Sequence, residues 1–385
     1  MSRSITIRSI QQFSIAMPYV ETLRTSFGEE PFKTAVLVRL ETEDGIVGWG
    51  EAPVEVHPGY SYETMETSAH ILREFLIPSL LGQTLSDATE VPSLLSHTRG
   101  HPLAKHSVEM AVWDALAQAN GQTLAESFAA HLPAGHTSRG KAKVGVSIGI
   151  KPSIEETLAV ISKRLSEGYA RIKLKIEPGW DVQLAAAVRE RYPDILLMLD
   201  ANSAYTLADA EHLKQLDRYN LLMLEQPLGY TDIYQHSQLQ PQMTTSICLD
   251  ESIHSADDAR LAFQLGACKI INLKPSRVSG YSESLEIYKV CVEHGAPLWI
   301  GGMMETGIGR AANVAFASLP GVTLPCDISA TSRYYARDLT EPPFELQPDS
   351  TLLVPKGLGL GVEVHEVRVQ EAADLWEREY PYKRG

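Results

Sequence analysis

The chain has 385 residues, of which 44% are hydrophobic and 21% are charged, a composition that is typical of globular proteins and excludes general disorder. Its 34 lysines and arginines stand against 48 aspartates and glutamates, and the net charge of −14 disfavours binding to nucleic acid or to an anionic membrane surface. The length exceeds a typical domain of about 150 residues, so we expect one or two domains and small-molecule or metal-ion partners.

The cysteines and the N-terminus indicate the compartment. Four cysteines form no CxxC pair and no repeated spacing, so we expect buried, reduced thiols. The first residues, MSRSITIRSI, alternate like a strand and lack the apolar core of a signal peptide. No run of about 18 apolar residues is present to span a membrane. We therefore expect a cytoplasmic protein. We also expect a homo-oligomer.

The first third of the chain predicts strands followed by helices. Residues 3–17 and 34–50 are strand-like, and Asp44-Gly45 is a turn signal within the second stretch. From Ser61 the pattern becomes helical and ends in KHSVEMAVWDALAQANG, where the last glycine provides a stop.

From about Lys141 short apolar strands alternate with amphipathic helices, which is typical of β/α units and a parallel sheet. Eight candidate strands end 24 to 28 residues apart, near Ser147, Lys175, Asp200, Glu225, Asp250, Lys274, Gly301 and Asp327. So regular a repeat predicts an α/β fold, a (β/α)8 TIM-like barrel. We expect an α+β capping domain over residues 1–135, the barrel over 136–341, and a tail over 342–385, in strand and turn texture, that returns to the capping domain.

Five of the predicted strands end in an ionisable residue: Lys175, Asp200, Glu225, Asp250 and Lys274. Catalytic residues of barrel enzymes lie at the C-terminal ends of strands, so these five should meet in one mouth, although each could instead cap a helix. The three carboxylates come from consecutive strands and would repel one another unless a cation lies between them. An all-oxygen set favours Mg²⁺ over zinc; the alternative is three separately paired acids.

The strand RIKLKI places Lys173 and Lys175 on one face, because side chains alternate. An amphipathic edge strand would explain this equally well, but in a barrel the apolar face packs on the helices and both lysines point inward. Lys274, four strands further round, should face Lys175 across the mouth. We expect burial near a cation to lower the pKa of such a lysine, so that it can remove the proton α to a metal-bound carboxylate and form an enediolate.

These residues together resemble the enolase superfamily, in its muconate-lactonising-enzyme-like subgroup. The resemblance covers nearly the whole chain and rests on RIKLK, LMLDANSAY, LLMLEQP, CLDES and INLKPSRVSG. Within the subgroup, GHPLAKHSVEMAVWD, GGMMETGIGR and the Lys-Pro-x-Arg at Lys274 to Arg277 look most like o-succinylbenzoate synthase/N-succinylamino acid racemase enzymes. This resemblance implies a small carboxylate substrate. The enzyme would racemise this substrate, dehydrate it in the menaquinone pathway, or do both.

The resemblance also implies a role for individual residues. Asp200, Glu225 and Asp250 would bind Mg²⁺, for which Mn²⁺ or another divalent ion could substitute. Lys175 and Lys274 would act on opposite faces of the substrate, with Lys173 supporting its carboxylate. Arg277 resembles an arginine of members that racemise. The substrate would also contact Ser147, Asn202, Met303, Ile328, Tyr19, Phe27 and Tyr60.

Other activities are weighed against this one. Muconate cycloisomerisation needs the same lysines and metal but a different pocket. Dipeptide epimerases carry Asp-x-Asp after the eighth strand, where this chain has Asp327-Ile328-Ser329. Mandelate-racemase-like members place a His-Asp pair on the seventh and sixth strands, which is absent here. A non-catalytic binding barrel would be expected to lack one or more of the five ionisable residues, and all are present.

Overall fold

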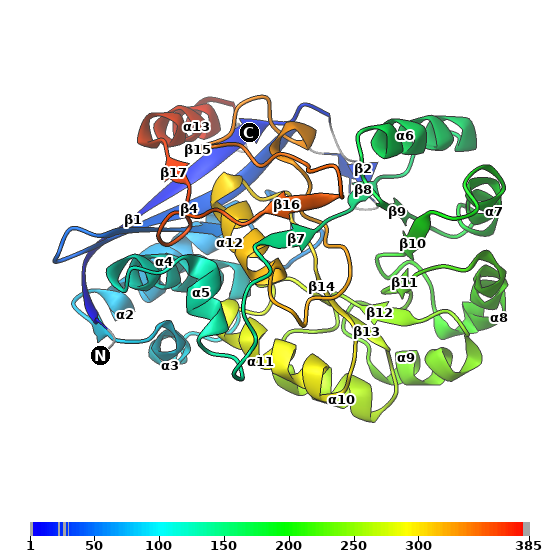
Figure 1. The fold of residues 1–385 in the computed structure, drawn as a ribbon, viewed down its shortest axis with the longest axis horizontal. Helices are drawn as coiled ribbons and strands as arrows, with labels where there is room; N and C mark the ends of the chain where they lie inside the picture. The colour runs from blue at the N-terminus through cyan, green and yellow to red at the C-terminus, as the bar shows by residue number, and fades with distance from the viewer. Residues whose placement is uncertain (1–2, 22–23, 26–27, 30, 380–385) are drawn as a thin grey trace.

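The computed structural model describes residues 3–21, 24–25, 28–29 and 31–379, which form two parts (Figure 1). The N-terminal part is built on a four-stranded sheet in the order β5-β4-β1-β6. Its strands are β1 (Ile5–Pro18), β4 (Phe32–Thr42), β5 (Val47–Ala52) and β6 (Thr84–Leu85). Separately, β2 (Arg24–Thr25) pairs antiparallel with β3 (Gly28–Glu29). The predicted turn is confirmed, because Gly45 lies between β4 and β5 with a φ of +79°.

Helices follow β5, as the sequence predicts. They are α1 (Met65–Ile71), α2 (Ile77–Leu80), α3 (Val91–Leu94), α4 (Pro102–Ala119) and α5 (Leu124–Ala129), with β6 between α2 and α3. The long helix α4 packs closely on β5 because Gly50 carries no side chain: a Cβ there would lie 1.8 Å from the Ser107 carbonyl oxygen.

The second part holds seven parallel strands in the unbroken order β14-β13-β12-β11-β10-β9-β8. These are β8 (Val146–Ile148), β9 (Arg171–Lys175), β10 (Leu196–Asp200), β11 (Leu224–Glu225), β12 (Ile247–Leu249), β13 (Ile270–Leu273) and β14 (Leu298–Ile300). The predicted eighth segment forms no regular strand and makes isolated bridges from Val322 to Leu298 and from Cys326 to Val144. It thereby closes the curled sheet between its first and last strands, and the expected barrel class is confirmed.

Helices alternate with these strands and cover the outer side of the sheet (Figure 1). They are α6 (Ile154–Ser166), α7 (Val182–Arg191), α8 (Ala210–Leu213), α9 (Tyr234–Leu239), α10 (Ala256–Gln264), α11 (Tyr281–Glu293) and α12 (Gly307–Ala317). The alternation arises because parallel strands need a crossover connection between them. Among the described residues, no helix is both long and apolar enough to cross a membrane.

The C-terminal segment returns to the rest of the molecule in three places. The strand β16 (Thr351–Leu353) pairs with β7 (Lys141–Lys143), and β17 (Glu363–Val364) pairs with β15 (Thr340–Glu341). A helix that the sequence analysis missed, α13 (Glu366–Glu379), lies beside β1 (Figure 1). The domain boundaries at residues 135 and 341 stay a prediction.

Candidate active site

The strand register places the predicted ionisable residues level with one another. Asp200 pairs with Lys175 on β9 and with Glu225 on β11. Glu225 pairs in turn with Cys248, and Asp250 lies two residues further along the chain, just past the end of β12. All three carboxyl groups are buried. The predicted meeting of these side chains at the C-terminal ends of the strands is therefore present.

Lys173 lies at the centre of the carboxylate cluster. Its Nζ is 2.6 Å from Asp327 Oδ2, 3.1 Å from Asp200 Oδ2 and 3.2 Å from Glu225 Oε2. Arg171, two residues earlier on the same face of β9, lies 2.7 Å from Asp327 Oδ1 through its Nη1. Both cations point inward, which excludes the edge-strand alternative for RIKLKI.

Lys175 and Asn202 form the next layer. Lys175 Nζ lies 2.6 Å from Asp200 Oδ2 and also donates to Asn202 Oδ1. The amide nitrogen of Asn202 donates to Glu251 Oε1 at 2.9 Å. The amide therefore connects the end of the second strand to the loop after the fifth.

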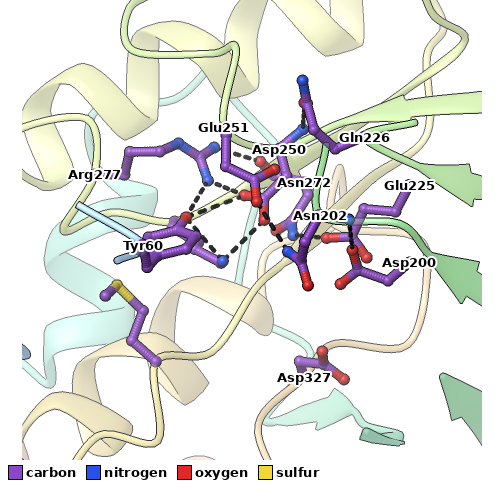
Figure 2. Close-up of polar contacts among 12 residues, drawn as sticks. Tyr60, Asp200, Asn202, Glu225, Gln226, Asp250, Glu251, Asn272, Arg277 and Asp327 are labelled. Atoms are coloured by element: carbon purple, nitrogen blue, oxygen red, sulfur yellow. Dashed lines mark hydrogen bonds and ion pairs between the residues drawn. The ribbon is translucent and has the colours of Figure 1, made fainter. Parts of the chain in front are cut away.

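Lys274 contacts Tyr60 of the N-terminal part, and Figure 2 shows Tyr60 beside Asp250 and Arg277. Lys274 Nζ is 2.9 Å from Asp250 Oδ2, 2.9 Å from the Tyr60 hydroxyl and 4.1 Å from the centre of the Tyr60 ring. Arg277 contacts the second oxygen of Asp250 and donates to the Tyr60 hydroxyl at 3.2 Å. A glycine makes room for Lys274, because a Cβ at Gly301 would lie 2.8 Å from its Cε.

Burial and neighbouring charges shift the pKa values of this cluster in opposite directions. Burial and then the Asp200 carboxylate raise the pKa of Glu225 well above its usual range. Burial would raise the pKa of Asp200 too, but Lys175 and Lys173 outweigh it and lower that pKa.

In the metal-free protein the pKa of Lys274 is raised, and the lowered pKa expected beside a bound cation stays a prediction. Burial does lower its pKa, but the charges of Asp250 and Tyr60 outweigh burial and raise it overall. The pKa of Lys173 is likewise raised, by Asp327, Glu225 and Asp200 against burial. The carboxylates near these lysines favour the protonated form of each lysine in the metal-free protein.

Two cavities meet at Tyr60 and Asn202, which line both. The inner cavity, of about 90 Å³, is also lined by Lys173, Lys175 and Lys274. The outer one, of about 530 Å³, lies between the loop around Tyr60, the start of α4 and the loops that follow the barrel strands. The inner cavity brings both candidate catalytic lysines to one small space, and the outer one leaves room for a larger substrate group.

The remaining predicted contact residues divide into two groups. Ser147 and Met303 line the inner cavity, and Arg277 lines the outer one. Ile328 is buried but lines neither cavity, and Tyr19 stacks on Tyr335 with ring centres 6.0 Å apart. Phe27 lies outside the described residues.

The sequence analysis missed several polar residues of the site. Asp327 ends the eighth segment and could have been counted with the other ionisable strand ends. Asn272, two residues before Lys274 and so on the same face, donates to Glu225 Oε1 at 2.6 Å. Glu251 had no sequence signal beyond its position next to Asp250. Burial and the Asp250 charge raise the pKa of Glu251 to about 7.

The carboxylates offer a metal ion only oxygen donors, which suits a hard divalent cation. In the structure each one contacts a lysine or an arginine, and Asp200 and Glu225 share Lys173. Over the part of the chain that the structure describes, no three carboxylate, imidazole or thiol groups converge closely enough to hold an ion. The donor chemistry fits Mg²⁺, and the metal-binding role stays a prediction.

Comparison with known proteins gives the class of this enzyme. Residues 9–127 match the family described as mandelate racemase/muconate lactonizing enzyme, N-terminal domain, and residues 156–368 match the family described as enolase C-terminal domain-like. The chain belongs to the enolase superfamily, in which these two domains occur together.

Its similar relatives carry two names. The chain is 49% identical over 90% of its length to an N-succinylamino acid racemase of an Amycolatopsis species, covering 92% of that protein. It is 44% identical over 94% of its length to the o-succinylbenzoate synthase of Bacillus subtilis, covering 95% of it. A crystal structure of an enolase-superfamily member from Enterococcus faecalis matches with a TM-score of 0.89 at 39% identity, covering 96% of this chain and 98% of that one.

Proposed function

We propose that this enzyme removes the proton α to a carboxylate by means of two opposed lysines, and that it racemises N-succinylamino acids, forms o-succinylbenzoate by dehydration, or does both. The observation that carries the proposal is that Lys175 and Lys274 line one cavity of about 90 Å³. The names of the relatives at 44% and 49% identity support the substrate class.

Asp200, Glu225 and Asp250 would hold Mg²⁺, or Mn²⁺ or another divalent ion in its place. A bound ion supplies positive charge that stabilises the negative charge developing on the substrate carboxylate as the α-proton leaves. Lys173 Nζ, within 3.2 Å of both Asp200 and Glu225, balances part of the charge of this cluster. The remaining steps belong to the two lysines that line the cavity.

In racemisation, the unprotonated amine of Lys175 takes the α-proton, and the electron pair of the C–H bond stays on the substrate. Lys274 then gives a proton from its ammonium group to the opposite face of the α-carbon. The raised pKa of Lys274, to which Asp250 contributes, supports its protonated form in this direction. In dehydration, the electron pair left by the α-proton expels a β-hydroxyl group, which takes the abstracted proton back from Lys175 and leaves as water, while Lys274 stays protonated.

Two other activities have weaker support. Muconate lactonizing enzymes match this chain at 25% identity, and an L-amino acid-D/L-Glu epimerase matches at 26%. Asp327 contacts Arg171 and Lys173 here, so its carboxylate is already paired with two cations. This pairing disfavours a role in binding the ammonium group of a dipeptide.

The proposal is tested by giving the purified enzyme with Mg²⁺ one enantiomer of several N-succinylamino acids, and separately the dehydration substrate. We expect loss of optical rotation in the first assay, formation of o-succinylbenzoate in the second, or both, and no turnover after chelation of the metal. Turnover of cis,cis-muconate or of a dipeptide in place of these substrates would contradict the proposal.

A further inference from the structure

Two charged residues are buried in the sheet of the N-terminal part, where apolar residues would be expected. Lys33 on β4 is 3% exposed and Glu51 on β5 is 0% exposed. Glu51 pairs with Leu37 across the two strands, and Lys33 lies four residues before Leu37. Lys33 and Glu51 therefore lie on the same face of the sheet. Burial of charge in a core is costly unless partners compensate it, so their contacts need an explanation.

Both residues bind the loop that follows the seventh barrel strand, Gly302–Thr306. Lys33 Nζ donates to the Met303 carbonyl at 2.8 Å. The Glu51 carboxylate accepts from the Thr306 amide at 3.0 Å, from the Thr306 hydroxyl at 2.7 Å and from the Gly309 amide at 3.0 Å. One residue thus holds the middle of the loop, and the other holds its end at the start of α12.

This loop forms part of the wall of the inner cavity, to which Gly302, Met303 and Met304 contribute. Met304 has a φ of +53°, in the left-handed region that residues other than glycine seldom adopt. The peptide groups on both sides of Met304 are held: Lys33 binds the Met303 carbonyl, and the Tyr335 hydroxyl donates to the Met304 carbonyl. Such a conformation persists only where its surroundings fix it.

We propose that Lys33 and Glu51 are positioning residues, which fix the Gly302–Thr306 loop as a wall of the substrate cavity. Through them the N-terminal part sets the shape of a cavity whose lysines belong to the barrel. Neither residue lines the cavity, so each acts through the loop. The substrates in this inference rest on the proposed function. The contacts that hold the loop do not depend on it.

Glu109 provides a matched control for a role that is only structural. It lies on α4 in the N-terminal part, is buried, and accepts from the amides of Tyr281 (2.5 Å) and Ser282 (3.0 Å) at the start of α11. It therefore binds a barrel helix as Glu51 does. Glu109, Tyr281 and Ser282 line neither of the two cavities described above.

The kinetic test compares Lys33→Met, Glu51→Gln and Glu109→Gln with the unchanged enzyme on small and large N-succinylamino acids. We expect kcat/KM to fall about tenfold or more in the first two variants, because small misplacements of a substrate wall are costly. The loss should lie mainly in KM and should differ between small and large substrates. Glu109→Gln should leave KM and the order of preference unchanged, whatever its effect on the unfolding temperature.

Two further measurements keep the proposal testable if Lys33→Met or Glu51→Gln folds poorly. Tyr335→Phe removes only the hydroxyl that holds the Met304 carbonyl, and we expect the same direction of change in KM. Hydrogen–deuterium exchange of the segment 301–309 should be faster in Lys33→Met and Tyr335→Phe than in Glu109→Gln. This exchange needs no substrate, so it tests the loop even if the enzyme has another activity. Folded variants with unchanged KM, preference and exchange would overturn the proposal.

Discussion

The Lys173 ammonium lies 2.6 Å from Asp327 Oδ2 and so joins the second barrel strand to the segment that closes the ring. Arg171 Nη1 lies 2.7 Å from the other oxygen of this carboxylate, Asp327 Oδ1. Arg171 and Lys173 lower the pKa of Asp327 against the effect of burial, so this carboxylate is charged between two buried cations. The contact also holds Lys173 where it reaches Asp200 and Glu225.

Replacement of Asp327 should strongly destabilise the fold. In Asp327→Asn, Arg171 and Lys173 lose their shared anion while they stay buried, and removal of one partner of a buried pair costs about 3–5 kcal/mol. Urea unfolding of the metal-free protein measures this change. Asp349→Asn is the control, because the pair of Asp349 with Lys141 is half exposed and solvent screening should leave it little effect on stability. Equal effects of the two substitutions would contradict the role given to Asp327.

Replacement of Glu225 should weaken metal binding and leave the stability of the metal-free protein unchanged or higher. The pKa of Glu225 is raised in the folded state, so ionisation of this carboxyl group destabilises the metal-free protein. Glu225→Gln should therefore unfold without metal at the same temperature as the unchanged protein or a higher one. It should lose the stabilisation that saturating Mg²⁺ gives the unchanged protein, because a ligand is missing.

Thermal unfolding with and without Mg²⁺ measures both effects. Asp181→Asn serves as a control, since Asp181 is a buried carboxylate that binds Tyr205 and His212 away from the cavity. It should keep the full response to Mg²⁺. A Glu225→Gln protein that Mg²⁺ still stabilises fully would show that Glu225 is no metal ligand.

The buried Glu109 predicts a pH dependence of stability. Burial raises the pKa of Glu109 from 4.5 to about 7, so between these values the folded state holds more protons than the unfolded state. The contribution of Glu109 is then fully present below pH 4.5, falls as pH rises, and is lost above pH 7; it amounts to about 3 kcal/mol at most. Urea titrations of the unchanged protein and of Glu109→Gln across this range measure the difference. Parallel curves for the two proteins would exclude the shift.

The periodicity of the sequence was sufficient to predict the barrel, because each β/α unit carries its own local pattern. Lys175, Asp200 and Glu225 were located correctly as the last residues of their strands, since an ionisable residue after an apolar run is a local signal. The same periodicity also predicted an eighth strand, but the segment at Cys326 makes only isolated bridges. A local sequence pattern does not indicate how completely the strands of a barrel pair around its circumference.

Contacts between distant parts of the chain had no such signal. The approach of Tyr60 to Lys274 and of Lys33 to Met303 depends on how the N-terminal part lies on the barrel. The direction of the Lys274 pKa shift in the metal-free protein had no local signal for the same reason. Burial of Lys274 could be inferred from its strand, but the balance between burial and Asp250 depends on distances that only the folded structure provides.

The most direct test of the two-lysine proposal is solvent exchange of the α-proton in D2O with Mg²⁺, followed by NMR on each enantiomer of an N-succinylamino acid. The unchanged enzyme should introduce deuterium into both enantiomers and interconvert them. Lys175→Ala and Lys274→Ala should each abolish interconversion, and each should retain exchange at most for the enantiomer whose proton faces the remaining lysine. Racemisation at the unchanged rate in either variant would contradict the account.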